Sequence, residues 1–234
     1  MPRTPTPRQR ARAEMEKRIL ETARALMAEV GPAQLSLRAV ARELGVASSA
    51  VYRYVASRDE LITWLILAIY GELADAAQAA CAEAPDEPAT QWSRWALTMR
   101  EWAHAHPYDW ALVYGTPIPG YAAPADTVEP AMRVLNPIMR ILGYANVPVE
   151  VDNDAAASLA PMRDLAAQFG ATRPVTSASS LAGIAAWSVI QGFINLELGG
   201  HFVGGVLDGA PVFDALVEQT ADQLGLSPAS PAIP

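Results

Sequence analysis

The chain has 234 residues, of which 51% are apolar and 18% charged, and its formal net charge is −8 at pH 7. This length and composition indicate a folded protein with one ordinary domain and room for a smaller second one, and they exclude a disordered chain. The single cysteine, Cys81, excludes an internal disulfide and a multi-cysteine metal site, and we expect it to be a buried apolar residue.

The charge is unevenly distributed along the chain. Residues 1–60 contain 11 of the 17 Lys and Arg and 7 of the 25 Asp and Glu, a net of +4, and the remainder contains 6 and 18, a net of −12. Because the local field steers binding more than the net charge does, only the front is expected to contact a polyanion. No apolar run follows the basic start, and the longest apolar segments fall short of the ~20 residues that cross a bilayer. We therefore expect a cytoplasmic protein with no membrane partner.

Helical periodicity runs along nearly the whole chain and predicts an all-α fold of about nine helices. The first pattern covers Arg12 to Val30, with its apolar residues on one face, and it ends at Gly31. Ser36 is expected to cap a second helix that closes at Gly45. Further helices are expected over about residues 48–55, 57–80, 91–106, 127–142, 153–169, 177–198 and 212–224, with Pro137 kinking or breaking one of them.

The segment from Leu37 to Tyr54 has the spacing of a helix-turn-helix. Two short helices that cross steeply need a small residue at the crossing, a turn residue tolerant of positive φ, and apolar residues that face a supporting helix. These demands are met by Val40, Ala41, Leu44, Gly45, Val46, Val51 and Tyr54. In this geometry the front of the second helix reaches base edges in the major groove of DNA.

Polar and small side chains at the front of these helices are the candidate DNA contacts. Small residues permit close approach to the groove, Arg53 suits a guanine edge, and Tyr52 and Ser36 suit phosphate oxygens. A helical hairpin buried inside a helical protein, the alternative, would not need this polar face. The expected DNA-binding residues are Ser36, Arg38, Ala47, Ser48, Ser49, Tyr52, Arg53, Tyr54 and Arg58.

Both ends of the chain are expected to be disordered. Residues 1–12 form a basic arm that either enters the adjacent minor groove or stays a solvated tail, and residues 227–234 form a Pro-rich tail.

The stretch "LETARALMAEVGPAQLSLRAVARELGVASSAVYRYVASRDELITWL" resembles the DNA-binding domain of the tetracycline-repressor family of bacterial transcription regulators. The resemblance covers about residues 15–65. It implies a three-helix DNA-binding domain over 13–60, and a larger helical domain over 61–226 for ligand binding and dimerisation. It assigns Ser36, Tyr52 and Arg58 to phosphates, with Arg58 in place of the usual lysine and Ser36 in place of the common threonine. It assigns Ser48, Ser49 and Arg53 to the groove.

The helices over 177–198 and 212–224 are the candidate dimer interface. The first carries no charge from Leu181 to Leu196 and is expected to be buried nearly all round. Two helices from each chain would form an isologous four-helix interface, as in the resembled family, and would present two recognition helices to a palindromic operator. A core within one chain is the alternative. The expected interface residues are Leu181, Ile184, Ala185, Phe213, Leu216, Val217, Thr220 and Leu224.

The resemblance also implies a small-molecule effector in the C-terminal domain. An apolar cavity with a few polar groups would suit a small apolar or aromatic compound, although each aromatic residue taken alone is more often part of a core. The candidate ligand-binding residues are Trp92, Trp95, Met99, Trp102, Trp110, Tyr114, Trp187, Gln191 and Asn195.

No enzyme, metal or cofactor signature is found in the sequence. His104 and His106, two residues apart on a helix, project about 200° from one another, which argues against a metal site with His201 and Asp109. A phosphate-binding loop, a nucleophile elbow and paired carboxylates on one face are also missing. We therefore expect a ligand-responsive regulator, a repressor that an effector releases from its operator. The alternatives are an architectural DNA-binding protein without effector and an enzyme activity in the C-terminal domain.

Overall fold

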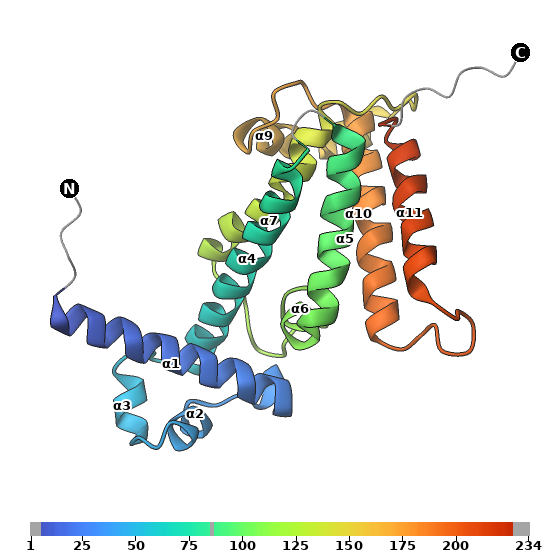
Figure 1. Cartoon of the computed structure of the whole chain (residues 1–234). Coiled ribbons are helices and arrows are strands. Elements are labelled where there is room, and N and C mark those ends of the chain that lie inside the picture. Colours follow the sequence, from blue (N-terminus) through green and yellow to red (C-terminus); the bar gives the residue numbers. More distant parts are fainter. Residues whose placement is uncertain (1–5, 85–86, 227–234) are drawn as a thin grey trace, which may run out of the picture. The chain divides into compact units, whose positions relative to one another are not determined.

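The computed structural model describes residues 6–84 and 87–226, and within them the regular structure is entirely helical (Figure 1). This confirms the all-α prediction. The expected helix over 153–169 is divided into two. The described residues therefore form more helices than the nine or so that were expected. The helices are α1 (Pro7–Val30), α2 (Leu37–Glu43), α3 (Ser48–Tyr52), α4 (Arg58–Ala82), α5 (Pro88–Ala105), α6 (Pro107–Tyr114), α7 (Val128–Leu142), α8 (Asn153–Ser158), α9 (Ala160–Gln168), α10 (Ser177–Leu198) and α11 (Gly209–Gln223).

The chain folds into two compact units that alternate along the sequence. Unit 1 comprises Met1–Tyr70 and His106–Val128, and unit 2 comprises Gly71–Ala105 and Glu129–Pro234. Unit 1 therefore holds α1 to α3, the first half of α4, and α6. This division differs from the predicted boundary at residue 60, because α6, although distant in sequence, packs against α1.

Helix α1 begins at Pro7, so the prediction of a disordered arm is wrong for residues 7–12. A capping box starts the helix: the Thr6 hydroxyl accepts a hydrogen bond from the Gln9 amide at 3.3 Å, and the Gln9 side chain accepts one from the Thr6 amide at 2.8 Å. Proline is favourable at the first helical position because its missing N–H would have no partner there. The rest of the expected arm, residues 1–5, and the expected tail 227–234 lie outside the described residues.

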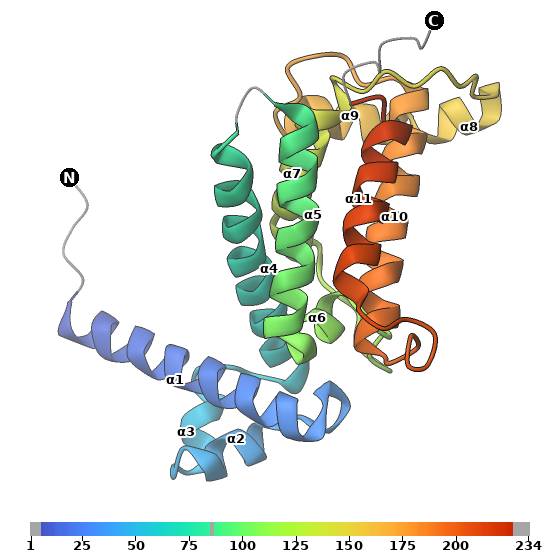
Figure 2. The same ribbon diagram turned by 45° about the vertical axis from the view of Figure 1, so that its right-hand side comes forward.

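Helices α1, α2 and α3 share one apolar core, and α2 and α3 lie on the same side of α1 in every view (Figure 2). Between α2 and α3 the chain turns at Gly45, whose φ of 69° is accessible to glycine at little cost, as predicted. Ser57 accepts a hydrogen bond from the Glu60 amide at 3.0 Å, as expected of a capping box, whereas the Glu60 carboxylate accepts from the Ala56 amide at 2.6 Å. The core is formed by Ile19, Ala23, Met27, Leu35, Leu37, Val40, Ala41, Val51 and Val55.

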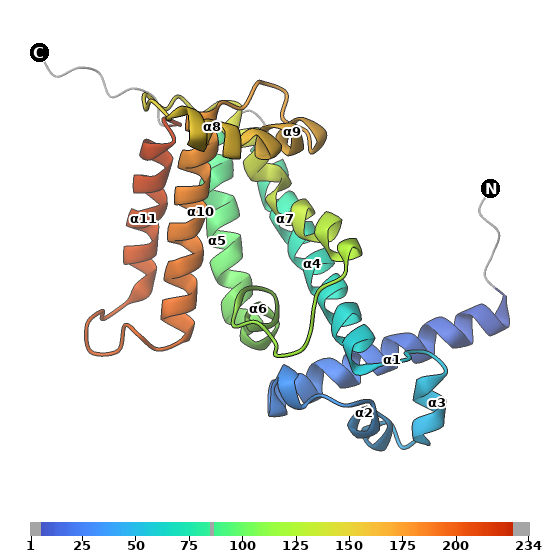
Figure 3. The same ribbon diagram turned by 180° about the vertical axis from the view of Figure 1, so that it is seen from behind.

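In unit 2, α5, α10 and α11 run side by side, and α9 lies next to the start of α10 (Figure 3). The indole of Trp92 on α5 is fully buried, and its Nε1 donates to the Thr220 hydroxyl on α11 at 3.0 Å and to the Val217 carbonyl at 3.2 Å. Its ring stacks on Trp95, with 5.6 Å between centroids. A buried indole with its N–H satisfied fixes α5 against α11.

Helix α7 continues through Pro137, which was expected to kink or break it. Proline has no N–H, so the carbonyl of Arg133, four residues earlier, loses its usual helical donor. The side-chain amide of Gln78 on α4 donates to this carbonyl at 3.2 Å. A side chain from a neighbouring helix thus replaces the missing backbone hydrogen bond.

Among the described helices, α4 and α10 are long and apolar enough to cross a membrane on those two criteria alone. The apolar runs within these helices are shorter than the helices themselves, and the sequence prediction considered only those runs. Core helices of globular proteins meet the same criteria, and α4 carries Glu72 and Asp75 near its middle. Length and composition therefore do not place either helix in a membrane.

Candidate functional site

The front of α3 is uncovered by the described residues of the chain. Val51 is 1% exposed and anchors the helix in the core, whereas Ser49, Tyr52 and Arg53 are exposed, Tyr52 to 49%. Ala47 is also exposed, and Ser48 is half-buried. A five-residue helix held by one apolar anchor thus presents small and polar side chains outward, as the sequence predicted for a helix that enters a DNA groove.

Ser36 begins α2, and its hydroxyl accepts a hydrogen bond from the Ala39 amide at 3.2 Å. The hydroxyl proton remains able to donate. The first amides of α2, like those at the N-terminus of any helix, have no acceptor within the helix. Arg38 is exposed in the first turn of α2. This arrangement of a hydroxyl, amides and a guanidinium suits a phosphate group.

Arg58 makes contacts that the sequence did not predict. Its guanidinium donates to the carbonyls of Pro32 at 2.9 Å and Leu35 at 3.2 Å, and it pairs with Asp59 at 3.4 Å. These bonds tie the start of α4 to the turn between α1 and α2. Because most of its donors are engaged within the chain, Arg58 holds the shape of the domain, and its expected contact with a phosphate stays a prediction.

Tyr54 also differs from its expected role as a DNA contact. It is half-buried, and the guanidinium of Arg12 on α1 lies 5.5 Å from the centre of its ring. A cation over an aromatic face is attracted to it, so the pair joins the segment after α3 to α1. Arg12 also pairs with Glu16 at 2.8 Å.

An ion pair between α1 and α6 was not foreseen. Both Nε and Nη2 of Arg24 lie within 2.7 Å of one carboxylate oxygen of Asp109, which is only 5% exposed. Also in unit 1, the Tyr121 hydroxyl lies 3.0 Å from that of Thr63 on α4. Partners separated by 85 and 58 residues carry no local sequence signal. These bonds explain why α6 belongs to the same unit as the helix-turn-helix.

The predicted dimer residues fall into two groups. Leu181, Ile184 and Ala185 on α10 are exposed, as an interface with another chain requires. The prediction is wrong for four residues of α11 and its end, because they are buried against their own chain. These are Phe213, Val217, Thr220 and Leu224, and Leu216 is half-buried.

Helix α10 is not buried all round, contrary to expectation. One face is covered by its own unit, whereas Leu181 and Leu196 remain 43% and 46% exposed, with Ile184 and Val189 also exposed between them. A row of apolar side chains open to solvent along about four turns is typical of a surface that interacts with a partner.

The aromatic residues proposed to bind a ligand do not gather in one unit. Trp92 and Trp95 are core residues of unit 2, and the Trp95 Nε1 donates to the Val134 carbonyl at 3.0 Å. Trp110 and Tyr114 pair in unit 1 with 4.6 Å between ring centroids, and burial raises the pKa of the Tyr114 phenol. Of the other candidates, Met99 and Trp102 are buried on α5, and Trp187, Gln191 and Asn195 are half-buried on α10.

His104 takes part in an ionic cluster between α5 and α10. Arg100 binds both carboxylate oxygens of Glu197 at 2.7 and 2.8 Å, and the His104 Nε2 lies 2.8 Å from the same carboxylate. The hydrogen bonds from Arg100 hold the pKa of Glu197 below its usual value. A Cβ atom at Gly209, the first residue of α11, would collide with this carboxylate. Within the described part of the chain, no three His, Cys, Asp or Glu side chains are grouped as metal ligands.

Comparison with known proteins gives matches over both parts of the chain. Residues 19–63 match the family model "Bacterial regulatory proteins, tetR family", and residues 92–220 match "Tetracyclin repressor-like, C-terminal domain". The HTH-type transcriptional regulators Rv1816 of Mycobacterium tuberculosis and Mb1846 of Mycobacterium bovis are each 39% identical over 223 residues, which cover 89% of this chain and 91% of theirs.

Solved structures agree with these matches. The crystal structure of SCO4313, assigned as a regulatory protein, is 34% identical with a TM-score of 0.76, over 93% of this chain and 100% of that chain. PfmR from Thermus thermophilus, a regulator at 19% identity with a TM-score of 0.56 over 88% of this chain and 98% of its own, shares the fold. The relatives are regulators and not enzymes, in agreement with the sequence prediction. The chain belongs to the TetR family of bacterial regulators, and it is a DNA-binding transcriptional regulator.

Proposed function

We propose that the protein is a homodimeric, ligand-responsive repressor that acts in the cytoplasm on a roughly palindromic operator. The observation that carries this proposal is the exposed front of α3, with Val51 buried behind it. The exposed front of α3 is not covered by the described part of its own chain, whereas the major groove of a DNA duplex accommodates such a helix.

The roles of individual residues follow from their exposure. Ala47, Ser48 and Ser49 allow α3 to approach the bases, and Arg53 donates to a guanine O6 and N7. Tyr52, Ser36 and Arg38 bind phosphates and set the register on the duplex. Exposed Arg8 and Arg10, on the first turn of α1, add positive charge to this unit.

Dimerisation uses the exposed face of α10. Leu181, Ile184, Ala185, Val189 and Leu196 form its apolar row, and α11 adds exposed Val212. The same face of a second copy is the natural cover, since a two-fold axis brings identical patches together. Two copies of α3 then read two half-sites of the operator.

The effector acts through unit 2, where the half-buried and buried candidates Met99, Trp102, Trp187, Gln191 and Asn195 lie. Helix α4 is a single element whose first half belongs to unit 1 and whose second half belongs to unit 2. A compound that shifts α4 changes the separation of the two α3 helices, and a stiff duplex then binds less tightly. By linkage, operator DNA weakens effector binding by the same factor.

Selection of bound fragments from random DNA, followed by fluorescence anisotropy with the selected duplex, tests the proposal. We expect an inverted repeat with half-site centres about one helical turn, or a multiple of it, apart. A compound screen against the protein–operator complex should then yield a compound that releases the DNA. Binding without sequence preference would instead support the architectural alternative, and an effector whose affinity is indifferent to operator would disprove the coupling.

A further inference from the structure

A pocket of about 500 Å³ opens in unit 2, where the ends of α4 and α7 meet the start of α5 and the segment after α9. It is lined by Gln78, Cys81, Ala82, Gln91, Arg140, Tyr144 and Thr172. This volume is within the range of small-molecule sites. None of these seven residues was expected from the sequence to bind a ligand.

The arginines around this pocket are unlike the others in the unit. Unit 2 contains six arginines and 16 Asp and Glu, a net of −10, so acidic partners are plentiful. Arg94 pairs with Glu83, Arg100 with Glu197 and Arg133 with Asp75, and Arg163 donates to the Ser177 hydroxyl.

The remaining two arginines, Arg140 and Arg173, have no carboxylate partner among residues 6–84 and 87–226. Arg140 lines the pocket, and Arg173 lies beside it. Arg163 also lacks a carboxylate partner but is held by the Ser177 hydroxyl, so the two guanidiniums of this acidic unit with neither kind of side-chain partner among the described residues are found at one place.

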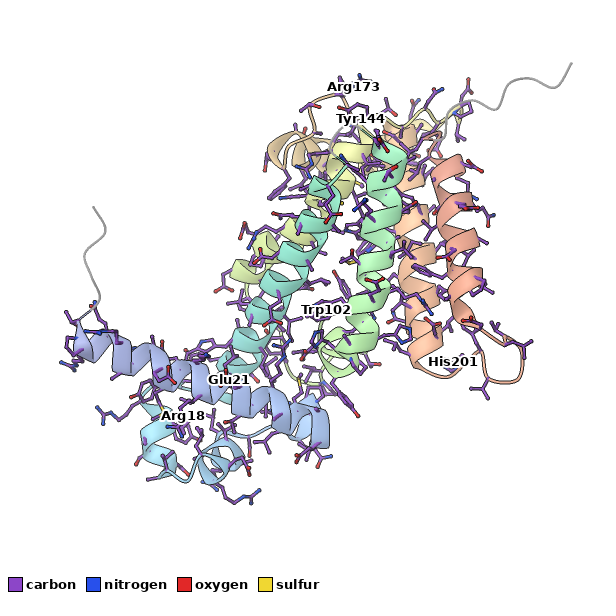
Figure 4. The ribbon with its side chains drawn as sticks, viewed as in Figure 1. Arg18, Glu21, Trp102, Tyr144, Arg173 and His201 are labelled. Carbon is purple, nitrogen blue, oxygen red and sulfur yellow. The ribbon has the colours of Figure 1, made fainter. Side chains whose placement is uncertain are left out.

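Packing holds these two side chains near the pocket. The guanidinium of Arg173 lies 4.3 Å from the centre of the Tyr144 ring, and both residues are labelled at the same end of the unit in Figure 4. Gly143 allows this approach, because a Cβ there would lie 3.0 Å from the Arg173 carbonyl oxygen. The Arg140 stem runs past Gly170, and its Cδ lies 3.7 Å from where a Cβ of that residue would be. Tyr144 therefore gives the pocket an aromatic side, and Arg140 gives it a cation.

The electrostatic environment of Cys81 agrees with this description. Burial raises the pKa of its thiol to about 11, while Arg140 and Arg94 act in the opposite direction. The groups that influence this thiol electrostatically are therefore cations, although the unit is acidic overall. The thiol is neutral at physiological pH and contributes an apolar surface.

We propose that this pocket binds a small organic carboxylate, with Arg140 pairing with the carboxylate group and Tyr144 contacting the apolar body. A guanidinium matches a carboxylate with two parallel hydrogen bonds. A pocket that places one cation beside an aromatic ring, a thiol and a methyl group, with amide and hydroxyl groups between them, suits an anion that has an apolar part. Identification of this carboxylate as the effector rests on the proposed function, whereas its binding at Arg140 does not.

Matched pairs of compounds test the carboxylate requirement. We would measure binding of 2-naphthylacetate, 4-phenylbutyrate and decanoate to the full-length protein by isothermal titration calorimetry and thermal shift, each against its neutral amide. At least one acid should bind, and its amide should bind at least about tenfold more weakly, because the charge-assisted hydrogen bonds are lost. If no acid binds more tightly than its amide, the proposal is overturned.

Variants locate the site. Arg140→Gln should weaken acid binding at least about tenfold and leave the amide unchanged, and Arg140→Lys should restore part of the affinity. Arg133→Gln, on the same helix but paired with Asp75, is the matched control and should bind as the unmodified protein does. Unfolding temperatures show whether each variant is folded. Acid binding that is unaffected in folded Arg140→Gln and Arg140→Lys would overturn the proposal.

Operator release separates this inference from the proposed function. If the acid binds at Arg140 but leaves the operator complex intact, carboxylate binding in this pocket is confirmed and its identification as the effector site is wrong. If another compound releases the operator equally from unmodified protein and Arg140→Gln, while acid binding depends on Arg140, the repressor function stands with its effector elsewhere.

Discussion

Helices α3 and α10 each leave one face uncovered, and the two faces have opposite chemistry. The face of α3 presents Ser49, Tyr52 and Arg53, whereas the face of α10 presents Leu181 and Leu196. Hydroxyls and a guanidinium suit phosphates and base edges, but apolar side chains gain free energy only when another apolar surface covers them. The exposed side chains of a helix therefore indicate what kind of partner covers it.

The charges of the two units extend this contrast. Unit 1 contains 11 Lys and Arg and nine Asp and Glu, a net of +2, whereas unit 2 has a net of −10. An acidic unit is repelled by nucleic acid and a basic one is attracted, so the charges favour contact of DNA with unit 1. The overall charge of −8 hides this division.

The largest expected effect concerns the core of unit 2 rather than either exposed face. Trp92→Ala should reduce the free energy of unfolding by about 3–5 kcal/mol, because the indole is fully buried and its hydrogen bonds are lost. Urea denaturation followed by circular dichroism measures this change. Trp187→Ala, at a half-buried position on α10, should have a smaller effect. Equal effects would contradict the description of Trp92 as a core residue.

A charge on the apolar face of α10 should break the dimer and with it tight DNA binding. Ile184→Glu is expected to give a monomer in analytical ultracentrifugation, and to weaken operator binding about a hundredfold or more because two linked half-sites become independent. Ala79→Glu, which adds the same charge at an exposed position of α4, is the control. A monomer that retains full operator affinity would refute the role of this face.

Two substitutions at the end of α3 should distinguish base reading from phosphate binding. Arg53→Ala should lose about 1–3 kcal/mol of discrimination at one base pair, because a bidentate contact to guanine is removed. Tyr52→Phe should weaken binding to all sequences by about 1 kcal/mol, because one phosphate hydrogen bond is lost. Anisotropy with the selected operator and with single-base variants measures both. If Arg53→Ala weakened all sequences alike, Arg53 would be a phosphate contact.

The smallest expected effect is an acid dependence in unit 2. The pKa of Glu197 is lowered in the folded protein, so its ionised form contributes stability above its ordinary value of 4.5, and this is lost as pH falls through the lower folded pKa. Glu197→Gln should therefore lose stability mainly above pH 4.5 and differ less from the unmodified protein in stronger acid. Urea titrations from pH 7 down to pH 3 check this, and a constant difference over that range would contradict it.

Local chemistry made much of the fold predictable. Gly45 and Ser36 act as the sequence predicts, because turns and caps depend on residues within a few positions of one another. The exposed front of α3 was predicted for the same reason. The start of α1 is the exception, since Thr6 and Gln9 form a capping box within the segment that was expected to be a disordered arm.

Longer-range contacts were not predictable from periodicity. A helical pattern shows that Phe213 and Val217 share a face, but it does not show whether that face meets another chain or, as here, its own α5. In the same way, nothing near Arg58 in sequence reveals that its guanidinium binds the carbonyls of Pro32 and Leu35. Side chains that act across more than about 20 residues become visible only in the fold.

The close approach of the Glu197 carboxylate to Gly209 limits how this protein can be engineered. Replacing a helical glycine with alanine is a common way to raise thermal tolerance, because it reduces the freedom of the unfolded chain. At position 209 a methyl group would push the Glu197 carboxylate away from Arg100 and weaken the contact between α5 and α10. A library of variants designed for higher thermal stability should keep glycine at this position.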